Sequence, residues 1–170
     1  VSPARVRLSP PLGSATERDL LDVNDRRQGL VELVDGMLVE KAMAMEESNW
    51  AALLVMHLMS FVLRHDLGKV YGPDCPYRLA PGLVRLPDVA FISWPRYRKP
   101  EYRGQLMAVA PDLAVEILSR SNTKREMERK LREYFEAGVR LAWVVDPKRR
   151  EVRVCTSATA PVVLTAADVL

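Results

Sequence analysis

The stretch PDLAVEILSRSNTKREMERKLREYFEAGVRLAWVVDP, residues 111–147, decides the fold. Its first apolar run, LAVEILS, and its last, RLAWVVD, are nearly continuous in hydrophobicity, as strands covered on both faces are. Between them, Asn122 or Thr123 caps a predicted helix that runs to about Ala137, and Gly138 ends it. A strand, a helix and a second strand in this order predict two parallel strands joined by a right-handed crossover.

The rest of the chain adds elements on both sides of this unit. We expect a helix at 16–28, a hairpin turning at Asp35-Gly36, a helix from Glu46 to about His65, short strands within 69–93, a strand at 151–157, and a short helix in the tail, TAADVL. This order predicts an α/β domain whose mixed sheet has helices on both faces. Residues 1–15, rich in proline, are expected to form an extended arm, and residues 16–170 a single domain.

Composition and charge exclude several classes of protein. The 170 residues carry 25 Lys and Arg against 22 Asp and Glu, and a net charge of +3 permits a nucleic-acid partner without identifying one. Cys75 and Cys155 are far apart and have no neighbouring Cys or His, which argues against a disulfide framework and a structural zinc site. The start has no signal-peptide core, and the longest apolar stretch, residues 50–63, is too short to span a bilayer. We therefore expect a soluble, cytoplasmic protein without a membrane partner.

Three carboxylates lie within or beside apolar strand segments. Glu116 has apolar neighbours on both sides in LAVEIL, Glu32 has them in LVELV, and Asp88 lies one residue before VAFI. An ionised carboxylate in such a place loses hydration at a cost of several kcal/mol unless a cation, a metal or hydrogen bonds compensate. Three acids that meet at one end of a sheet would form a magnesium site, because Mg²⁺ prefers carboxylate oxygens. Each acid taken singly is also explained by an edge position or by a salt bridge to an arginine.

Two lysines of the predicted helix after Glu116 are candidates for a role beside these acids. The apolar stripe of that helix, which predicts core, consists of Met127, Leu131, Tyr134 and Phe135. Lys130 lies at the edge of this stripe, from which its side chain either reaches the carboxylates or extends to solvent. Lys124 points close to the stripe but lies in the first turn, where a fraying end can turn it outward.

Five segments between about Leu30 and Ser157 match a known family in their order and spacing: VELVDGMLVE, RLPDVAFIS, PDLAVEILSRSN, KLREYFEAGVRLAWVVDP and EVRVCTS. In these segments the chain resembles the Uma2 family, a large bacterial group within the PD-(D/E)XK restriction-endonuclease-like superfamily. The resemblance implies a restriction-endonuclease-like core of three layers, a mixed sheet flanked by helices. It also implies metal-dependent hydrolysis of phosphodiester bonds.

The resemblance assigns roles to individual residues. Asp88 matches the aspartate of the Pro-Asp pair and Glu116 the second metal-binding acid, so these two would hold Mg²⁺, for which Mn²⁺ is an expected substitute. Lys130 matches a catalytic lysine moved from strand to helix, since Leu118 occupies the usual lysine position. Glu32 matches the acid of the first strand, which would bind a second metal, position the water or only tether the other ligands.

The resemblance thus implies a magnesium-dependent endonuclease that acts on DNA. The chain departs from the family at Arg120, where proline is usual, and in MAMEESNW, which lacks the usual histidine. Two alternatives stay open: a non-cleaving relative that binds nucleic acid or a partner, and an RNA-directed nuclease. Cleavage of both strands of a duplex has two-fold symmetry, which favours a homodimer. No nucleotide cofactor is expected.

A loop between the two metal-binding strands is a candidate nucleic-acid contact. WPRYRKPEYR, residues 94–103, interleaves cations that suit phosphates with aromatic rings that suit base stacking, although a solvated loop explains it equally. The candidate binding residues are Arg96, Arg98, Lys99 and Arg103 of this loop and Lys124 of the following helix. His57 falls on an apolar helical stripe and is interpreted as a packed core histidine.

Overall fold

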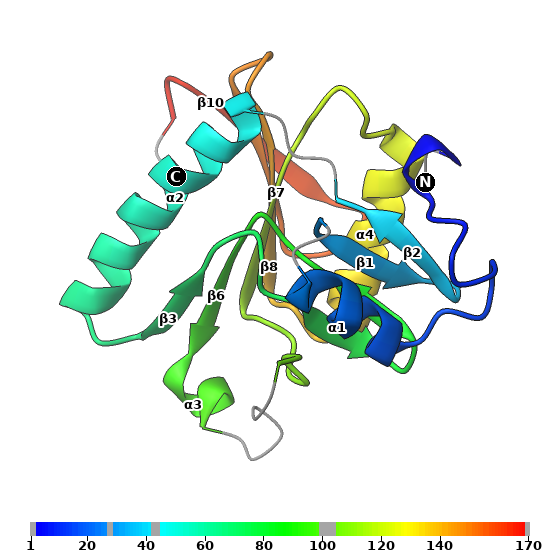
Figure 1. Cartoon of the computed structure of the whole chain (residues 1–170). Coiled ribbons are helices and arrows are strands. Elements are labelled where there is room, and N and C mark those ends of the chain that lie inside the picture. Colours follow the sequence, from blue (N-terminus) through cyan, green and yellow to red (C-terminus); the bar gives the residue numbers. More distant parts are fainter. Residues whose placement is uncertain (1–2, 27–28, 42–44, 99–104, 169–170) are drawn as a thin grey trace.

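The residues that the structure describes form two β-sheets and four α-helices (Figure 1). The computed structural model describes residues 3–26, 29–41, 45–98 and 105–168. The larger sheet has six strands in the order β10-β9-β8-β7-β6-β3, of which only β7 and β8 are parallel neighbours. Their bounds are β3 Gly68–Tyr71, β6 Val89–Ser93, β7 Leu113–Ile117, β8 Leu141–Asp146, β9 Glu151–Cys155 and β10 Pro161–Thr165.

The predicted strand–helix–strand unit is confirmed as β7, α4 and β8. Helix α4 spans Lys124–Glu136, and the Thr123 hydroxyl accepts a hydrogen bond from the Glu126 backbone amide at its start. Gly138, with a φ of 89°, follows its end, as a left-handed residue after a helix commonly does. Strands β7 and β8 pair in parallel, as predicted, with Glu116 beside Val144.

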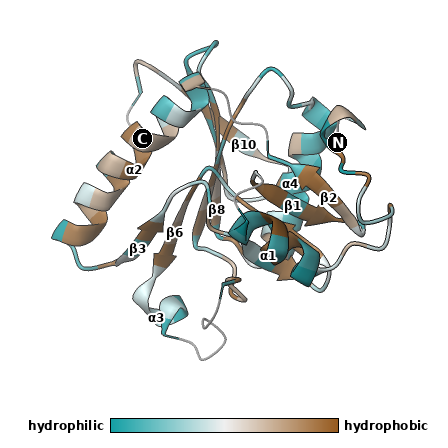
Figure 2. Cartoon of the chain, viewed as in Figure 1, coloured by the Kyte–Doolittle hydropathy of each residue, from teal (hydrophilic) through white to brown (hydrophobic). Residues whose placement is uncertain are grey.

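Helices cover both faces of the six-stranded sheet. On one face, Ala142 and Val144 of β8 pack with Met127 and Leu131 of α4. On the opposite face, Leu113, Val115 and Ile117 of β7 pack against α2, which spans Met45–Arg64. Because side chains alternate across a strand, Glu116 lies on the α4 side. Figure 2 shows hydrophobic strands at the centre and a mainly hydrophilic α1, with α2 more hydrophobic than either α1 or α4.

A separate four-stranded sheet differs from the single mixed sheet that the sequence predicted. Its order is β2-β1-β5-β4, with β1 Val31–Val34, β2 Met37–Glu40, β5 Leu83–Arg85 and β4 Tyr77–Ala80. The predicted hairpin is confirmed, with positive φ at Asp35 and Gly36. The prediction failed because Leu33 of β1 pairs with Val84 of β5, a long-range choice that hydrophobic patterning does not encode. Helix α1, Glu17–Asp25, begins with a capping box at Thr16 and buries Leu20 against this sheet.

Two further predictions are wrong. In the tail, Pro161–Thr165 forms β10 and the residues to 168 form a turn rather than a helix, because β10 pairs along its whole length with β9. His57 is exposed rather than packed in the core, because α2 turns Ala51 and Val62 toward the sheet.

The short helix α3, Trp94–Tyr97, opens the predicted basic loop. None of the helices in the described ranges is long and apolar enough to cross a membrane.

The N-terminal segment lies along the β1–β2 hairpin. A 3-10 turn, Pro3–Arg5, is followed by a bridge between Val6 and Val39, and the Arg7 amide donates to the Leu38 carbonyl. Arg5 forms an ion pair with Glu126 of α4. The segment therefore brings a cation to the junction of α4 and the two sheets.

Candidate catalytic centre

A small pocket between the two sheets holds all four predicted catalytic residues. Its volume is about 10 Å³, which suffices for about one water. The acids come from three elements: Glu32 from β1, Asp88 from the residue before β6, and Glu116 from β7. The sequence predicted that the three acids would meet at one end of a single sheet. In the structure they meet between the two sheets instead. The lining residues are Arg5, Glu32, Lys41, Asp88, Glu116, Ile117, Asn122 and Lys130.

Glu116 is held by two donors from α4. The Lys130 Nζ lies 2.9 Å from Oε2 of Glu116, and the Tyr134 hydroxyl donates to Oε1 at 2.5 Å. Lys130 and Tyr134 are four residues apart and therefore share one face of the helix. Glu116 is only 5% exposed, so these donors replace the hydration that its carboxylate loses.

Asp88 is held by a backbone amide and a lysine. The Ile117 amide donates to Oδ2 of Asp88 at 2.7 Å, which ties the start of β6 to the end of β7. The Lys41 Nζ lies 2.9 Å from Oδ1 and also donates to the carbonyls of Leu86 (2.5 Å) and Pro73 (3.2 Å). Lys41 directly follows β2, so the hairpin delivers this ammonium to the pocket.

Glu32 links the pocket to a second buried cation. Its carboxylate accepts from Nη1 of Arg85 at 2.7 Å and lies 3.1 Å from the Lys130 Nζ. Arg85 is fully buried, and its Nε donates to Glu133 of α4 at 2.8 Å. The same Lys130 ammonium therefore contacts both Glu32 and Glu116, each from a different sheet.

The two glutamates differ in pKa although both are buried. For Glu32, burial alone would raise the pKa, but the nearby Lys130 and Arg85 outweigh it and lower the pKa to about 2. For Glu116, burial raises the pKa and the Lys130 ammonium opposes this only in part. The neighbouring charges of Asp88 and Glu32 raise the pKa of Glu116 further. Burial is therefore the main cause of the raised pKa of Glu116, which the ammonium groups of Lys130 and Lys41 only partly offset.

The donors are fixed in their protonated forms. Burial would lower the pKa of Lys130, but Glu116 and Glu32 raise it above its usual value, so the ammonium keeps its proton at neutral pH. Burial and the charge of Glu116 raise the pKa of Tyr134 well above its usual range. Lys130 and Tyr134 thus act as hydrogen-bond donors in this pocket, and neither is a general base.

Asp88 and Glu116 carry the oxygen atoms that a divalent cation in this pocket would contact. Each carboxylate oxygen of Asp88 and Glu116 has one partner and keeps a second lone pair beside it. Within the described ranges no cluster of three or more His, Cys, Asp or Glu side chains is arranged to hold a metal. Asp88 and Glu116 would supply two ligands, and the pocket, which has room for about one water, would have to widen to admit the other ligands of an octahedral Mg²⁺.

Three residues of this network were missed by sequence reasoning. The only sign of Lys41 in the sequence is that a cation directly follows an apolar strand. The only sign of Arg85 is that a cation lies between the apolar residues Val84 and Leu86. Tyr134 was assigned to the core alone, although a buried tyrosine hydroxyl needs a polar partner. Such signals show that a partner is needed, whereas the identity of the partner depends on the tertiary fold.

Among the residues predicted to bind nucleic acid, Arg96, Arg98 and Lys124 are described by the structure, and none of these three lines the pocket. Arg96 pairs with Asp112 at 3.1 Å and donates to the carbonyls of Ala110 and Gly138, so its guanidinium bonds within the fold. Arg98 is exposed, with its guanidinium 5.6 Å from the Trp94 ring centroid. Lys124 is exposed and lies 3.8 Å from Glu128. Lys99 and Arg103 lie outside the described residues.

A larger cleft adjoins the pocket and shares Lys41 with it. Its volume is about 940 Å³. One wall comes from the start of α2 and includes the exposed ring of Trp50, and the other comes from the segments after β7 and β8. The lining residues are Lys41, Met45, Glu46, Glu47, Trp50, Leu118, Ser119, Arg120, Ser121, Pro147 and Lys148.

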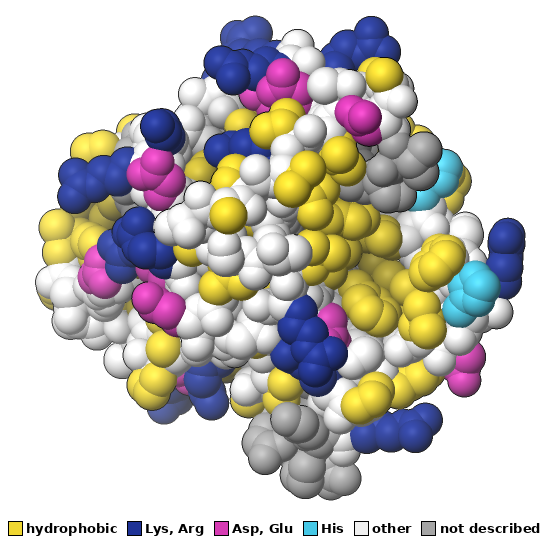
Figure 3. All heavy atoms as spheres, turned by 180° about the vertical axis from the view of Figure 1, so that it is seen from behind, with side chains coloured by type: hydrophobic (Ala, Val, Ile, Leu, Met, Phe, Trp, Pro, Cys, Tyr) yellow, Lys and Arg dark blue, Asp and Glu magenta, His cyan; other side chains and the backbone are white. Residues whose placement is uncertain are grey.

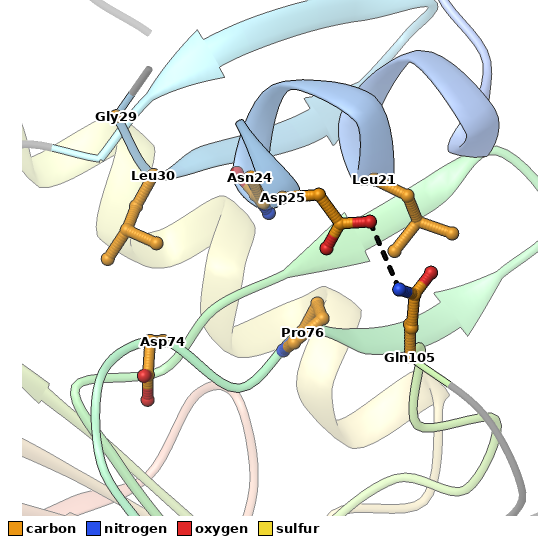
Figure 4. Close-up of a pocket in the computed structure, with 8 residues that line it drawn as sticks. All are labelled: Leu21, Asn24, Asp25, Gly29, Leu30, Asp74, Pro76 and Gln105. Carbon is orange, nitrogen blue, oxygen red and sulfur yellow. Dashed lines mark hydrogen bonds between the residues drawn. The ribbon is translucent and has the colours of Figure 1, made fainter. Parts of the chain in front are cut away.

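A third hollow lies beside α1, away from the predicted catalytic residues (Figure 4). Its volume is about 400 Å³, and the Gln105 amide donates to Asp25 across it at 3.0 Å. Leu21, Leu30 and Pro76 supply apolar walls. None of the predicted site residues that the structure describes lines this hollow.

Comparison with known proteins agrees with this architecture. Residues 18–169 match the Uma2 family, described as "Putative restriction endonuclease". The structure is similar to the crystal structure of a "putative nuclease belonging to DUF820" from Anabaena variabilis, with a TM-score of 0.73 and 20% sequence identity, covering 84% of this chain and 80% of that chain. At that identity the likeness supports the fold alone. No curated protein matches the chain.

Proposed function

We propose that this chain, which belongs to the Uma2 family, is a divalent-metal-dependent nuclease that hydrolyses phosphodiester bonds of DNA. The observation that carries the proposal is the meeting of Asp88 and Glu116 in one pocket with the Lys130 ammonium 2.9 Å from Glu116. Two carboxylates and a protonated lysine are the groups that this chemistry needs. A purely structural role could be filled by apolar side chains, without the cost of burying the Glu116 carboxylate.

Each residue of the pocket has a distinct role in the proposed reaction. Asp88 and Glu116 would hold Mg²⁺ or Mn²⁺, which when bound screens the phosphate and lowers the pKa of a coordinated water. Lys130 keeps its proton, so it stabilises the negative charge that develops on the phosphate and orients the attacking water. Glu32, ionised because of its lowered pKa, holds Lys130 in place from the opposite sheet.

The adjoining cleft is the proposed path of the nucleic acid. It meets the pocket at Lys41, so a strand in the cleft would present a phosphate to Asp88 and Glu116. Trp50 offers a ring for base stacking, and Arg120 and Lys148 offer charges for phosphates. This path replaces Arg96 as the proposed contact, because the Arg96 guanidinium already bonds to Asp112 and to backbone carbonyls. The exposed Arg98 and Lys124 remain proposed peripheral contacts, together with Lys99 and Arg103.

Cleavage assays on purified protein test the proposal. Wild type is expected to nick plasmid DNA only with Mg²⁺ or Mn²⁺, and D88N, E116Q and K130A to lose at least about a hundredfold in rate. The matched controls are E128Q and E136Q, exposed changes on α4 that should keep the wild-type rate. Equal cleavage by D88N and wild type would mean that a contaminating nuclease or another site is responsible. Parallel assays with RNA of the same sequence distinguish the RNA-directed alternative.

One observation favours a non-cleaving relative as a second candidate. Lys41 and Lys130 each pair with one of the two acids, so the network is partly neutralised without a metal. Calorimetric titration separates the two candidates. Binding of Mn²⁺ that disappears in D88N and in E116Q supports the nuclease, whereas no binding by wild type supports the non-cleaving relative.

A further inference from the structure

Arg5 brings a guanidinium to the pocket between the sheets from outside both sheets. It ends the 3-10 turn Pro3–Arg5 and lines the pocket together with the proposed metal ligands Asp88 and Glu116. In Figure 1 the N-terminal segment (dark blue) runs beside the start of α4 (yellow), where Arg5 pairs with Glu126. Because the pocket has room for only about one water, the side chains that line it face the same small space.

The backbone of the segment that carries Arg5 is fixed to the β1–β2 hairpin. Val6 forms a bridge with Val39, and the Ala15 amide donates to the Gly36 carbonyl at 2.9 Å. Ala15 is also buried in the core cluster that α1 and β1 share. Arg5 therefore has a defined place at the pocket, although it belongs to neither sheet.

The ion pair with Glu126 uses only part of the Arg5 guanidinium. Its Nη2 contacts Oε1 of Glu126, a side chain that is 1% exposed. Among the described residues, the Nε of Arg5 and the Oε2 of Glu126 find no hydrogen-bond partner, although both atoms are buried. Arg129, in contrast, binds both oxygens of Asp35, at 2.7 and 2.8 Å. Because a buried donor without an acceptor costs free energy, the Arg5 Nε is available to an acceptor that enters the pocket.

Asn122 offers a second donor on the wall of the same pocket. Its Oδ1 accepts from the amide and the hydroxyl of Ser119, at 2.8 and 3.0 Å, which fixes the orientation of the side-chain amide. Within the part of the chain that the structure describes, no group accepts from the Asn122 Nδ2. A guanidinium and an amide that both have donors to spare are groups that bind the oxygens of a phosphate.

Positive charge is dispersed on the face of the molecule shown in Figure 3. Lys and Arg side chains (dark blue) stand there in separate groups, several of them beside Asp or Glu (magenta), and the coloured residues form no continuous basic surface on that face. Affinity for a phosphate backbone comes largely from cations that neutralise phosphates, and the net charge of this chain is only +3. A phosphate at the pocket therefore depends on the individual cations that line it, of which Arg5 is one.

We propose that Arg5 binds the phosphate that undergoes hydrolysis, with Asn122 as a second donor to its oxygens. This inference rests on the proposed nuclease function and adds to it Arg5, which lies outside the stretch that matches the family, residues 18–169. A guanidinium donates from a fixed plane, and it stabilises the negative charge that develops on the phosphate during attack. Lys130 acts from α4 and Arg5 from the N-terminal segment, so two cations from different elements hold one phosphate.

Replacement of the whole ion pair separates a phosphate contact from a structural role. R5M/E126M removes one positive and one negative side chain, so it keeps the net charge, and apolar side chains often replace a buried ion pair without loss of stability. Anisotropy of a short fluorescent DNA single strand, at several NaCl concentrations and with Ca²⁺ in place of Mg²⁺, measures binding. The slope of the logarithm of the binding constant against that of the NaCl concentration should become less steep by about 0.7, the share of one phosphate contact. The matched control R7A, on the same segment but outside the pocket, should keep the wild-type slope.

Single-turnover cleavage with Mg²⁺ and saturating protein measures the effect on the chemical step. R5M/E126M should lose about a hundredfold in rate, and R7A should keep the wild-type rate. N122D has nearly the same shape but presents a carboxylate oxygen in place of Nδ2, so it should lose about tenfold. R5K keeps the charge but not the planar donor set, and it should also lose about tenfold.

An unchanged salt slope in R5M/E126M overturns the inference, because the pair then serves the fold alone, and so does an unchanged rate. Circular dichroism shows whether each variant is folded. If R5M/E126M does not fold, N122D and R5K decide, since both keep a cation beside Glu126, and wild-type rates in both overturn the inference. Binding without cleavage by wild type defeats the nuclease proposal only, and the salt slope still decides whether Arg5 contacts a phosphate.

Discussion

Lys130 and Glu116 form a buried ion pair, with Nζ 2.9 Å from Oε2 and the two side chains 5% and 7% exposed. The lysine comes from α4 and the glutamate from β7, so the pair ties the helix to the central strand that it covers. The same Nζ lies 3.1 Å from Glu32 of the second sheet. One ammonium therefore holds together three elements that meet at the candidate catalytic centre.

Removal of this ammonium should strongly destabilise the fold. K130A leaves Glu116 and Glu32 without their shared cation, and breaking such a buried pair costs about 3–5 kcal/mol. Urea unfolding followed by circular dichroism measures the loss. K124A, at an exposed position of the same helix, should change the free energy of unfolding by less than about 0.5 kcal/mol. Equal stability of K130A and wild type would show that the pair contributes nothing.

Glu32 should make stability fall in acid. Its pKa is about 2 in the folded state against 4.5 ordinarily, so its contribution is complete above pH 4.5 and is lost as the pH falls toward 2. This difference corresponds to roughly 3 kcal/mol. The gap in stability between wild type and E32Q should therefore shrink between pH 5 and pH 3 in urea titrations. A gap that is constant over this range would contradict the lowered pKa.

Glu116 should have the opposite dependence on pH. Its pKa is raised, so the folded state holds the proton more tightly, and stability falls as the pH rises above 4.5 through the raised value. E116Q removes this titration, so the stability of E116Q relative to that of wild type should increase as the pH rises from 4 to 8. Unfolding midpoints of the two proteins in urea measure the trend. A difference that narrows with rising pH would contradict it.

A divalent cation should stabilise the protein through the acids of the pocket. At a Mg²⁺ or Mn²⁺ concentration one hundred times the dissociation constant, binding adds about 2.7 kcal/mol to the free energy of unfolding. For a chain of this size the melting temperature should rise by roughly 5–10 °C. D88N should lose this rise, and E128Q should keep it. A rise of equal size in D88N would place the cation elsewhere.

Gly36 should tolerate a side chain far less well than Gly138 does. Both have positive φ, but a Cβ at Gly36 would lie 2.4 Å from the Gly13 carbonyl oxygen, whereas a Cβ at Gly138 meets nothing within 4 Å. Both alanine variants carry the backbone strain of about 1–2 kcal/mol, and G36A adds the clash. Thermal melts should rank wild type, G138A and G36A in that order of stability. The reverse order of the two variants would mean that the hairpin and the N-terminal segment separate freely.

Sequence periodicity predicted those elements whose signals are local. The unit of β7, α4 and β8 and the hairpin at Asp35-Gly36 were predicted because continuous apolar runs, a cap and a turn dipeptide each lie within a few residues. The strand β10 and the separate four-stranded sheet were missed, because a strand partner is chosen across long separations. His57 was assigned to the core for a similar reason, since a helix with apolar residues on all sides does not reveal which side meets the sheet.

For the candidate site the division is similar. By itself the sequence determined that Glu32, Asp88 and Glu116 lie within or beside apolar strands and need partners, because a carboxylate cannot lose its hydration without compensation. Only the tertiary structure decided which partners they have: Lys41 for Asp88, Arg85 for Glu32, and Lys130 shared between Glu32 and Glu116. The physical reason is the separation along the sequence. The residues next to each acid show that it needs a counter-charge, whereas the residue that supplies the counter-charge lies on another sheet or helix and comes close only when the chain folds.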